Sequence, residues 1–362
     1  MDAQPALQRW FPWAAWPWVF NAPMFSIANG KLAAEVVKAG GIGMVPAGMD
    51  PRPGSPHLAE LDEYLGTAAA ILGYDPSSAE PLPIGIGFTT MRATPEIYKA
   101  SAVPIILKHK PAFVWLFGSD PAAYGEFVSL FHVVGKSWNM KVLVQVGSVA
   151  AAIQVARAGA DAVVAQGSDA GGHLWARGAS IVTLVPEVVE ALRKEDDLKA
   201  KEIPVIAAGG IVNGRGIAAA MVLGASGITM GTRFITCPES GAAPYVRRAV
   251  LRSTDGGATT TVSQMHDTIP GYPIYPSPYS GRAVVHKGIE DLENGASLED
   301  VTAAFQKAKE EGDESRFVTF AGTGVGLIDN PVPAGEIVAQ VTAEALQIIQ
   351  KLKVGNAIAQ KI

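Results

Sequence analysis

The sequence repeats one pattern eight times: a short apolar run, a polar loop and a segment with helical periodicity. Each repeat has the length of one strand-plus-helix unit, and strands that alternate with helices pair in parallel. The strand candidates are residues 19–21, 42–45, 83–87, 112–117, 141–146, 161–166, 203–207 and 227–230. Helical patterns between them include residues 31–39, 58–72, 121–135, 149–158, 181–194 and 217–223. Eight such units predict a (β/α)8 TIM barrel.

The composition supports strands that are covered on both faces. Only 17% of the 362 residues are charged, whereas 48% are hydrophobic. Parallel strands that carry helices on both sides read as continuous apolar runs and need few charges. A barrel with insertions commonly reaches this length as one unit.

The repeat stops after the eighth strand. Residues 254–278 are rich in Thr, Gly, Pro and Tyr, a charged helical stretch follows at 298–312, and a last helix runs from about residue 333 to 352. We therefore expect a barrel formed by residues 1–240 and 318–362, with residues 241–317 as a smaller lid-like substrate subdomain over its mouth. A solvated interaction arm is the alternative.

Charge and cysteine content exclude several classes of protein. The net charge is −5 and no block of Lys or Arg occurs, so we expect neither nucleic acid nor a membrane as a partner. The apolar run at 10–20 contains Pro12 and Pro17 and is too short to span a bilayer, which favours an aromatic arm that plugs one barrel end. Cys237 is the single cysteine, which fits a reducing cytoplasm, and no ligand spacing indicates a metal.

The stretch 161–173, DAVVAQGSDAGGH, joins a buried strand to a glycine loop that ends on a histidine. Gly171 and Gly172 let the backbone approach a ligand closely, and His173 places a titratable ring beside it. This combination predicts a cofactor site with a base.

Two further glycine loops follow the seventh and eighth strand candidates. The first contains Gly209 and Gly210, and the second runs through Met230, Gly231 and Thr232. In barrels of this type, phosphate groups bind at the loops after strands seven and eight, where backbone N–H groups and a helix N-terminus favour an anion.

The first strand ends in Asn21-Ala22-Pro23-Met24, and no GxGxxG motif opens the first helix. A dinucleotide site is therefore not expected. One phosphate site beside a wide barrel mouth predicts a mononucleotide cofactor, for which FMN is the economical choice.

Four motifs together resemble those of the nitronate monooxygenases, formerly called 2-nitropropane dioxygenases. They are NAPM at 21–24, QGSDAGGH at 166–173, AAGGIVNGRGIAAAMVLGASGITMGTRF at 207–234 and FAGTGVGLID at 320–329. The resemblance covers most of residues 19–350. The same FMN-barrel superfamily contains an FMN-dependent enoyl reductase and NAD(P)H:quinone reductases.

The resemblance implies a site residue by residue. His173 corresponds to the family's catalytic base. The implied FMN contacts are Asn21, Met24, Gly87, Gln166, Gly171, Gly210, Thr229, Met230, Gly231 and Thr232. Gly87 stands where relatives often have Asn, and Thr229 where many have Gln, so backbone contacts are expected at these two positions. Asp169 replaces a common Glu.

The resemblance also implies a reaction, in which an alkyl nitronate, or a nitroalkane that His173 first deprotonates, reacts with FMN and O2 to give a carbonyl compound and nitrite. Two alternatives stay open: an NAD(P)H-dependent FMN reductase acting on a quinone or an enoyl thioester, and a flavin-binding protein without turnover. A homodimer is compatible with each of these functions.

For the remaining histidines and for three tyrosines of the insertion, we expect mainly structural roles. We expect His57, His109 and His132 to have structural or solvent roles. His266 and His286 lie in the insertion, from which either could reach the mouth. Tyr272, Tyr275 and Tyr279 are expected to pack the insertion.

Overall fold

The structure, a computed structural model, describes residues 5–359 except 92, 119 and 273–274. Eight parallel strands form one sheet in the order β1-β9-β8-β6-β5-β4-β3-β2. They are β1 (Val19–Asn21), β2 (Gly43–Pro46), β3 (Leu82–Thr89), β4 (Pro111–Phe117), β5 (Lys141–Val146), β6 (Ala162–Gln166), β8 (Val205–Ala208) and β9 (Gly227–Met230). All eight predicted strands are present, with ends shifted by one or two residues at several of them.

The two ends of this sheet meet between β1 and β2. Phe20 and Ile42 form a parallel bridge, and the backbone N–H of Ile42 donates to the carbonyl of Val19 at 2.8 Å. One step further, the side-chain amide of Asn21 accepts from the N–H of Met44 and donates to its carbonyl, both at 2.9 Å. The sheet is therefore a closed barrel, as predicted.

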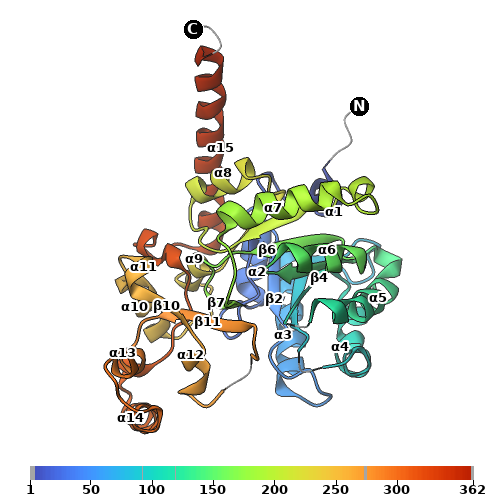
Figure 1. The fold of residues 1–362 in the computed structure, drawn as a ribbon. Helices are drawn as coiled ribbons and strands as arrows, with labels where there is room; N and C mark the ends of the chain where they lie inside the picture. Colours follow the sequence, from blue (N-terminus) through green and yellow to red (C-terminus); the bar gives the residue numbers. More distant parts are fainter. Residues whose placement is uncertain (1–4, 92, 119, 273–274, 360–362) are drawn as a thin grey trace.

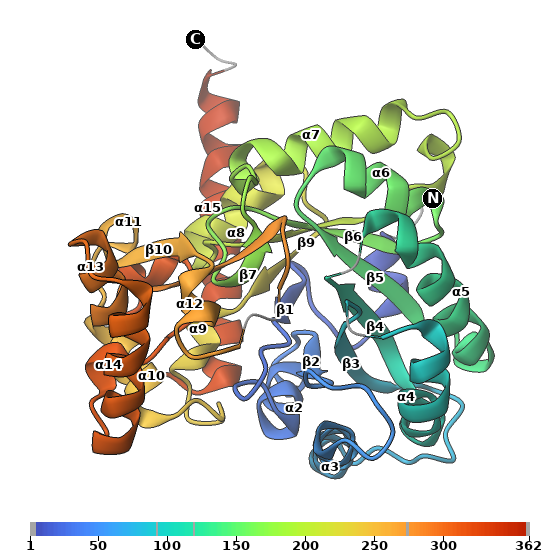
Figure 2. The ribbon, with the colours of Figure 1, turned by 60° about the horizontal axis from the view of Figure 1, so that its bottom comes forward.

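Helices surround the barrel, with the strands in the middle (Figure 2). They are α2 (Gly30–Lys38), α3 (Pro56–Leu72), α4 (Pro95–His109), α5 (Tyr124–Val134), α6 (Val149–Arg157), α7 (Ile181–Lys194), α8 (Gly214–Val222) and α15 (Ala334–Ala359). The C-terminal end of α15 extends beyond the body of the molecule (Figure 1). No helix in the described part of the chain has the length and apolar character needed to cross a membrane.

Helix α4 was not predicted. Its apolar residues lie on every side of the helix, so the sequence shows no amphipathic periodicity. Pro104 lies inside the helix, where proline normally disfavours helical structure. The other barrel helices are amphipathic or end on glycine, and their positions are confirmed.

The barrel interior is packed with apolar side chains. Phe113 fills it so completely that a Cβ on Gly85 would lie 2.1 Å from the Phe113 ring. At one end, Leu7 and Phe11, from α1 (Ala6–Trp10) and the residue after it, join the same cluster and are at most 1% exposed. The prediction that the N-terminal aromatic segment plugs the barrel is confirmed.

A second, three-stranded antiparallel sheet has the order β10-β11-β7, with β7 (Gly172–Trp175), β10 (Thr260–Ser263) and β11 (Tyr279–Val284). Strand β7 follows directly on the loop after β6, so one edge of this sheet comes from the barrel and the rest from the insertion. The sequence predicted a glycine loop that ends on His173, and this was wrong for Gly172 and His173, which begin β7. For β10 and β11, in the insertion, the sequence made no strand prediction. Short strands of Thr, Ser and Gly lack the apolar run that marks barrel strands.

Short helices complete the region after β9, gathered on one side of the barrel (Figure 2). They are α9 (Thr232–Ile235), α10 (Pro244–Arg252), α11 (Gly256–Thr259), α12 (Met265–Thr268), α13 (Lys287–Glu293) and α14 (Leu298–Glu311). Helix α14 corresponds to the predicted charged helix.

Candidate active site

His173 lies in β7, opposite Gly281 of β11. Glycine is required at position 281, because a Cβ there would come within 2.7 Å of the Phe320 ring. The rings of His173 and Phe320 have centroids 5.0 Å apart, and the His173 carbonyl accepts a hydrogen bond from the Gln166 amide at 3.1 Å. The predicted base is thus fixed above the end of β6 by the second sheet.

Asp267, on α12, pairs with this histidine. His173 Nε2 lies 2.7 Å from Asp267 Oδ2, and the two side chains are only 15% and 12% exposed. Asp267 was not among the predicted site residues, because it lies 94 positions from His173 in the sequence. Its only local signal was its position next to His266, a histidine already considered for the mouth.

Tyr275 covers the His173 ring. The two rings are stacked, with centroids 3.6 Å apart and planes within 17°. Tyr275 also lies 6.0 Å from the ring of Phe117 at the end of β4, and Tyr279 packs edge-on to Phe117 at 5.2 Å. Two of the three tyrosines that were expected to pack the insertion therefore contact the barrel mouth, whereas Tyr272 is 58% exposed.

The AGGH loop and the 320–329 segment meet backbone to backbone. A Cβ on Gly171 would lie 2.4 Å from the Ala321 carbonyl carbon, and one on Gly322 would lie 2.6 Å from the Asp169 carbonyl oxygen. The N–H of Gly322 donates to the Thr232 hydroxyl at 3.0 Å. The structure thus brings together the loops after β6 and β9, and glycine permits the approach.

Gly210, after β8, belongs to the same junction. Its φ of +72° is a left-handed conformation, and an added Cβ would lie 2.9 Å from the Cβ of Asp169. The Asp169 carboxylate accepts from the hydroxyl of Ser180 at 2.6 Å and from that of Thr323 at 3.3 Å. A side chain at position 210 would displace Asp169 and, with it, the loop that leads to His173.

Two polar atoms at the barrel mouth are buried without a hydrogen-bond partner among the described residues: Gln166 Oε1 on β6 and Thr229 Oγ1 on β9. Gln166 lies two residues after Val164, and Thr229 two after Gly227, both of which face the barrel interior, so their side chains point inward as well. Buried polar atoms normally have partners. A cofactor that carries hydrogen-bond donors fits here, and a side-chain contact from Thr229 fits as well as the expected backbone contact.

Of the other predicted cofactor residues, Met24 and Gly231 adjoin each other, and the remaining three make structural contacts. Met24 and Gly231 lie together, since a Cβ on Gly231 would be 3.5 Å from the Met24 sulfur. Gly87 is covered by Pro23, whose Cβ would be 2.4 Å from a Cβ on Gly87, so glycine is needed here for packing. The amide of Asn21 is engaged by Met44, as described above, and the side chain of Met230 is fully buried in the core outside the strands. Cofactor contacts from these residues stay predictions.

At the amino end of α8, two of the N–H groups that the sequence suggested for a phosphate are already engaged. The side chain of Asn213 accepts from the N–H of Gly216 at 3.1 Å, and Glu344 of α15 accepts from the N–H of Gly214 at 2.7 Å. A carboxylate already occupies this helix end, so the glycines of the two loops, not α8, are the candidates for holding a phosphate.

His266 and His286 form a buried pair next to this site. His266 Nδ1 lies 3.2 Å from His286 Nε2, and His266 Nε2 lies 3.0 Å from the carbonyl of Thr261. Burial lowers the pKa of both rings, and for His286, with the nearby His266 and Arg316 adding to the effect, to about 4. Both side chains are therefore neutral near pH 7.

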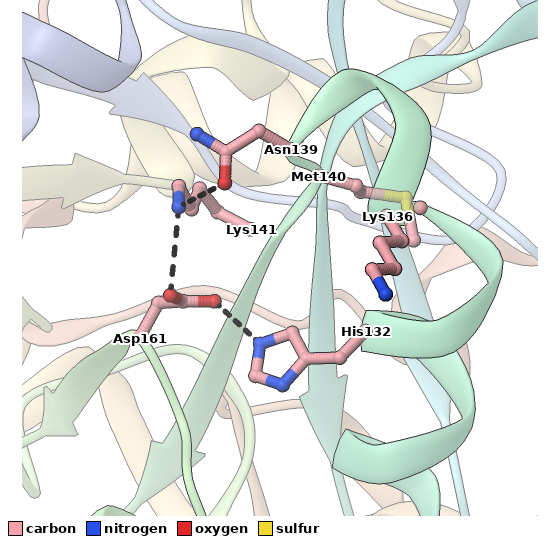
Figure 3. Close-up of a pocket in the computed structure, with 7 residues that line it drawn as sticks. His132, Lys136, Asn139, Met140, Lys141 and Asp161 are labelled. Atoms are coloured by element: carbon pink, nitrogen blue, oxygen red, sulfur yellow. Dashed lines mark hydrogen bonds and ion pairs between the residues drawn. The ribbon is translucent and has the colours of Figure 1, made fainter.

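A polar cavity of about 230 Å³ is lined by His132, Lys141 and Asp161 among others (Figure 3). Lys141 begins β5 and Asp161 precedes β6, so the cavity lies at the amino ends of these strands, whereas His173 follows the carboxyl end of β6. In the cavity, Asp161 pairs with His132 at 2.8 Å and lies 3.7 Å from the ammonium group of Lys141. The carboxylate also accepts from the N–H of Val142 at 2.8 Å. These contacts bear out the structural interpretation of His132. Among the described residues, no group of three or more His, Cys, Asp or Glu side chains could hold a metal ion.

Comparison with known proteins assigns the family. The sequence profile described as "Nitronate monooxygenase" matches residues 135–344. The chain is 42% identical to a nitronate monooxygenase of Neurospora crassa, over 97% of this chain and 96% of the relative. It is 34% identical to the nitronate monooxygenase npaC of Metarhizium robertsii, over 96% of each. The protein belongs to the nitronate monooxygenase family and is an oxidoreductase.

Solved structures support the fold. FabK from Thermotoga maritima superposes with a TM-score of 0.72 at 24% identity, covering 97% of this chain and 99% of that one. A nitroalkane oxidase from Streptomyces ansochromogenes gives the same TM-score and identity, covering 96% and 100%. Both confirm the barrel fold that was predicted from the repeat.

Proposed function

We propose that the protein oxidises alkyl nitronates, and neutral nitroalkanes after deprotonation, with O2 to carbonyl compounds and nitrite, using FMN. The observation that carries the proposal is the placement of His173 at the mouth of a barrel of this family, next to two buried polar atoms that lack partners. Named relatives that match almost the whole chain support the substrate class.

The residues at the barrel mouth fit a flavin mononucleotide. Gln166 and Thr229 would accept hydrogen bonds from it, and Met24 and Gly231 would border it. The loops at Gly210 and at 231–232 would hold one phosphate, and no GxGxxG motif provides for a pyrophosphate. A bound flavin supplies the electron acceptor for the oxidation.

The side chains around His173 define what this chain contributes to a neutral substrate. A nitroalkane becomes reactive when its α-carbon loses a proton, and a positioned base contributes about 10²–10⁴-fold to such a step. Tyr275 and Phe320 cover the imidazole and limit its contact with water. A preformed nitronate has already lost this proton, so His173 would only orient it.

The test is aerobic release of nitrite from a panel of nitroalkanes and preformed nitronates, measured on purified protein together with NADH and NADPH oxidation. We expect nitrite from the nitronates. We expect no oxidation of NADH or NADPH when no nitro compound is present. Rapid NAD(P)H oxidation with a quinone or an enoyl thioester and no nitrite would overturn the proposal in favour of a reductase. Chromatography of the flavin released on denaturation should show FMN and not FAD.

A further inference from the structure

We propose that Asp267 is a positioning residue that holds His173 in the tautomer with its hydrogen on Nε2, so that Nδ1 is the atom that takes the substrate proton. The inference rests on the proposed function, because it concerns the deprotonation of a neutral nitroalkane. It adds a residue that the sequence motifs do not contain.

The hydrogen bond between the two side chains selects the tautomer of His173. An ionised carboxylate only accepts hydrogen bonds, so at 2.7 Å the hydrogen between Asp267 Oδ2 and His173 must be carried by Nε2. Nε2 is then a donor in the neutral ring as well as in the imidazolium. In the neutral ring the lone pair is on Nδ1, which makes no hydrogen bond with the described residues.

The ring has little freedom to exchange its two nitrogens. Tyr275 stacks on it at 3.6 Å, Phe320 lies 5.0 Å away, and the backbone of His173 is paired with Gly281 in the sheet. A flip of the imidazole would have to part it from Tyr275 and break the bond to Asp267. The sheet and the two rings therefore preserve the orientation that the carboxylate selects.

Backbone hydrogen bonds fix the position of Asp267. Its N–H donates to the carbonyl of Gln264 at 3.1 Å, and its carbonyl accepts from the N–H of Tyr272 at 2.8 Å. The preceding residue, His266, is 1% exposed and bonds through Nε2 to the carbonyl of Thr261 on β10. The carboxylate thus has a fixed place relative to the sheet that carries His173.

The chemical step balances without a further reactant. The C–H bond at the α-carbon breaks, its proton moves to His173 Nδ1, and the electron pair spreads onto the nitro group to give the nitronate. The imidazolium formed donates from Nε2 to the Asp267 carboxylate at 2.7 Å, and this hydrogen bond stabilises the new charge. Asp267 contacts neither substrate nor cofactor in this scheme and acts only through His173.

The first test compares Asp267→Asn with wild type on neutral nitroethane and on preformed ethyl nitronate, with full-length flavin-loaded protein. An Asn amide can donate to Nε2 and so stabilise the wrong tautomer. We expect kcat/KM for nitroethane to fall by at least about 10-fold, up to the 10²–10⁴-fold contribution of the base itself. Turnover of the nitronate should stay within about 3-fold of wild type, because no proton is removed.

The pH profile separates positioning from a structural role. Without the carboxylate, the imidazolium is less stable, so the pH of half-maximal nitroethane turnover should move to lower values in Asp267→Asn. Glu299→Gln is the matched control, since it removes an exposed carboxylate from α14. It should change neither rates nor pH profile. Equal losses on both substrates, or an unshifted pH profile, would overturn the proposal.

A second measurement leaves Asp267 unchanged. With ¹⁵N-labelled histidine in the wild-type holoenzyme, and the His173 signals assigned by their loss in His173→Asn, the neutral ring should carry its hydrogen on Nε2. A predominant Nδ1–H tautomer would overturn the role of Asp267 even if nitronate turnover is normal. A wild-type enzyme that releases no nitrite from nitronates, but shows the Nε2–H tautomer, would instead refute the proposed function.

Discussion

The amide of Asn21 pairs with both backbone groups of Met44, at 2.9 Å each, across the junction where the barrel closes. Main-chain pairing between β1 and β2 ends at Phe20 and Ile42, so a side chain completes the ladder. The residue that begins the NAPM motif thus has a structural task as well as the cofactor contact that the family resemblance implies.

Asn21→Ala should destabilise the protein. The substitution leaves a buried N–H and a buried carbonyl of Met44 without partners, at about 1–3 kcal/mol each, so we expect the free energy of unfolding to fall by about 2–6 kcal/mol. Urea denaturation measures this. Asn294→Ala, at an exposed position, should change it by less than about 0.5 kcal/mol. Unchanged stability with loss of flavin would instead identify Asn21 as a cofactor ligand alone.

Gly210→Ala should abolish flavin retention. The new Cβ would lie 2.9 Å from that of Asp169, in a backbone conformation with φ +72°. Gly73→Ala is the matched control, because Gly73 has φ +62° but no atom within 4 Å of an added Cβ. It should cost only the strain of a left-handed alanine, about 1–2 kcal/mol, and keep the flavin. The ratio of flavin to protein after gel filtration decides, and equal retention in both variants would show that the loop tolerates the crowding.

His173→Asn should separate the two substrates. We expect turnover of neutral nitroalkanes to fall by about 10²–10⁴-fold and turnover of preformed nitronates to fall far less. Steady-state nitrite release measures both, at verified flavin content. His132→Asn, at the opposite end of the barrel, should leave both rates close to wild type. The role of base fails if the His173 variant keeps its flavin and loses both activities by the same factor.

Stability should decrease as the pH falls from about 6.5 to 4, in part because of His286. Burial, with the neighbouring His266 and Arg316, lowers its pKa to about 4, whereas the unfolded chain takes up this proton near 6.5. Below 6.5 protons favour the unfolded state, and the loss approaches about 3 kcal/mol when the pH reaches 4. Urea midpoints between pH 7 and 4.5 should show a flatter dependence in His286→Gln than in wild type. Identical slopes would contradict the effect.

The sequence by itself determined the barrel. Each strand is a local apolar run, most of the helices are amphipathic or glycine-capped, and eight repeats allow few other architectures. It also located His173 and the glycine loops, because each follows directly on a strand, and the carboxyl ends of parallel strands meet at one end of a barrel. Among the described barrel helices, α4 gave no periodic signal, because its apolar residues lie on every side and Pro104 lies inside it.

The tertiary structure decided what surrounds the base. The contacts of His173 with Asp267, Tyr275 and Phe320 join residues about 90 to 150 positions apart, and they depend on β7 leaving the barrel to pair with β11. Periodicity and turn signals act over a few residues, so they carry no information about such a pairing. The same holds for Glu344, whose carboxylate accepts from the N–H of Gly214 at the amino end of α8, where the local sequence predicted a phosphate site.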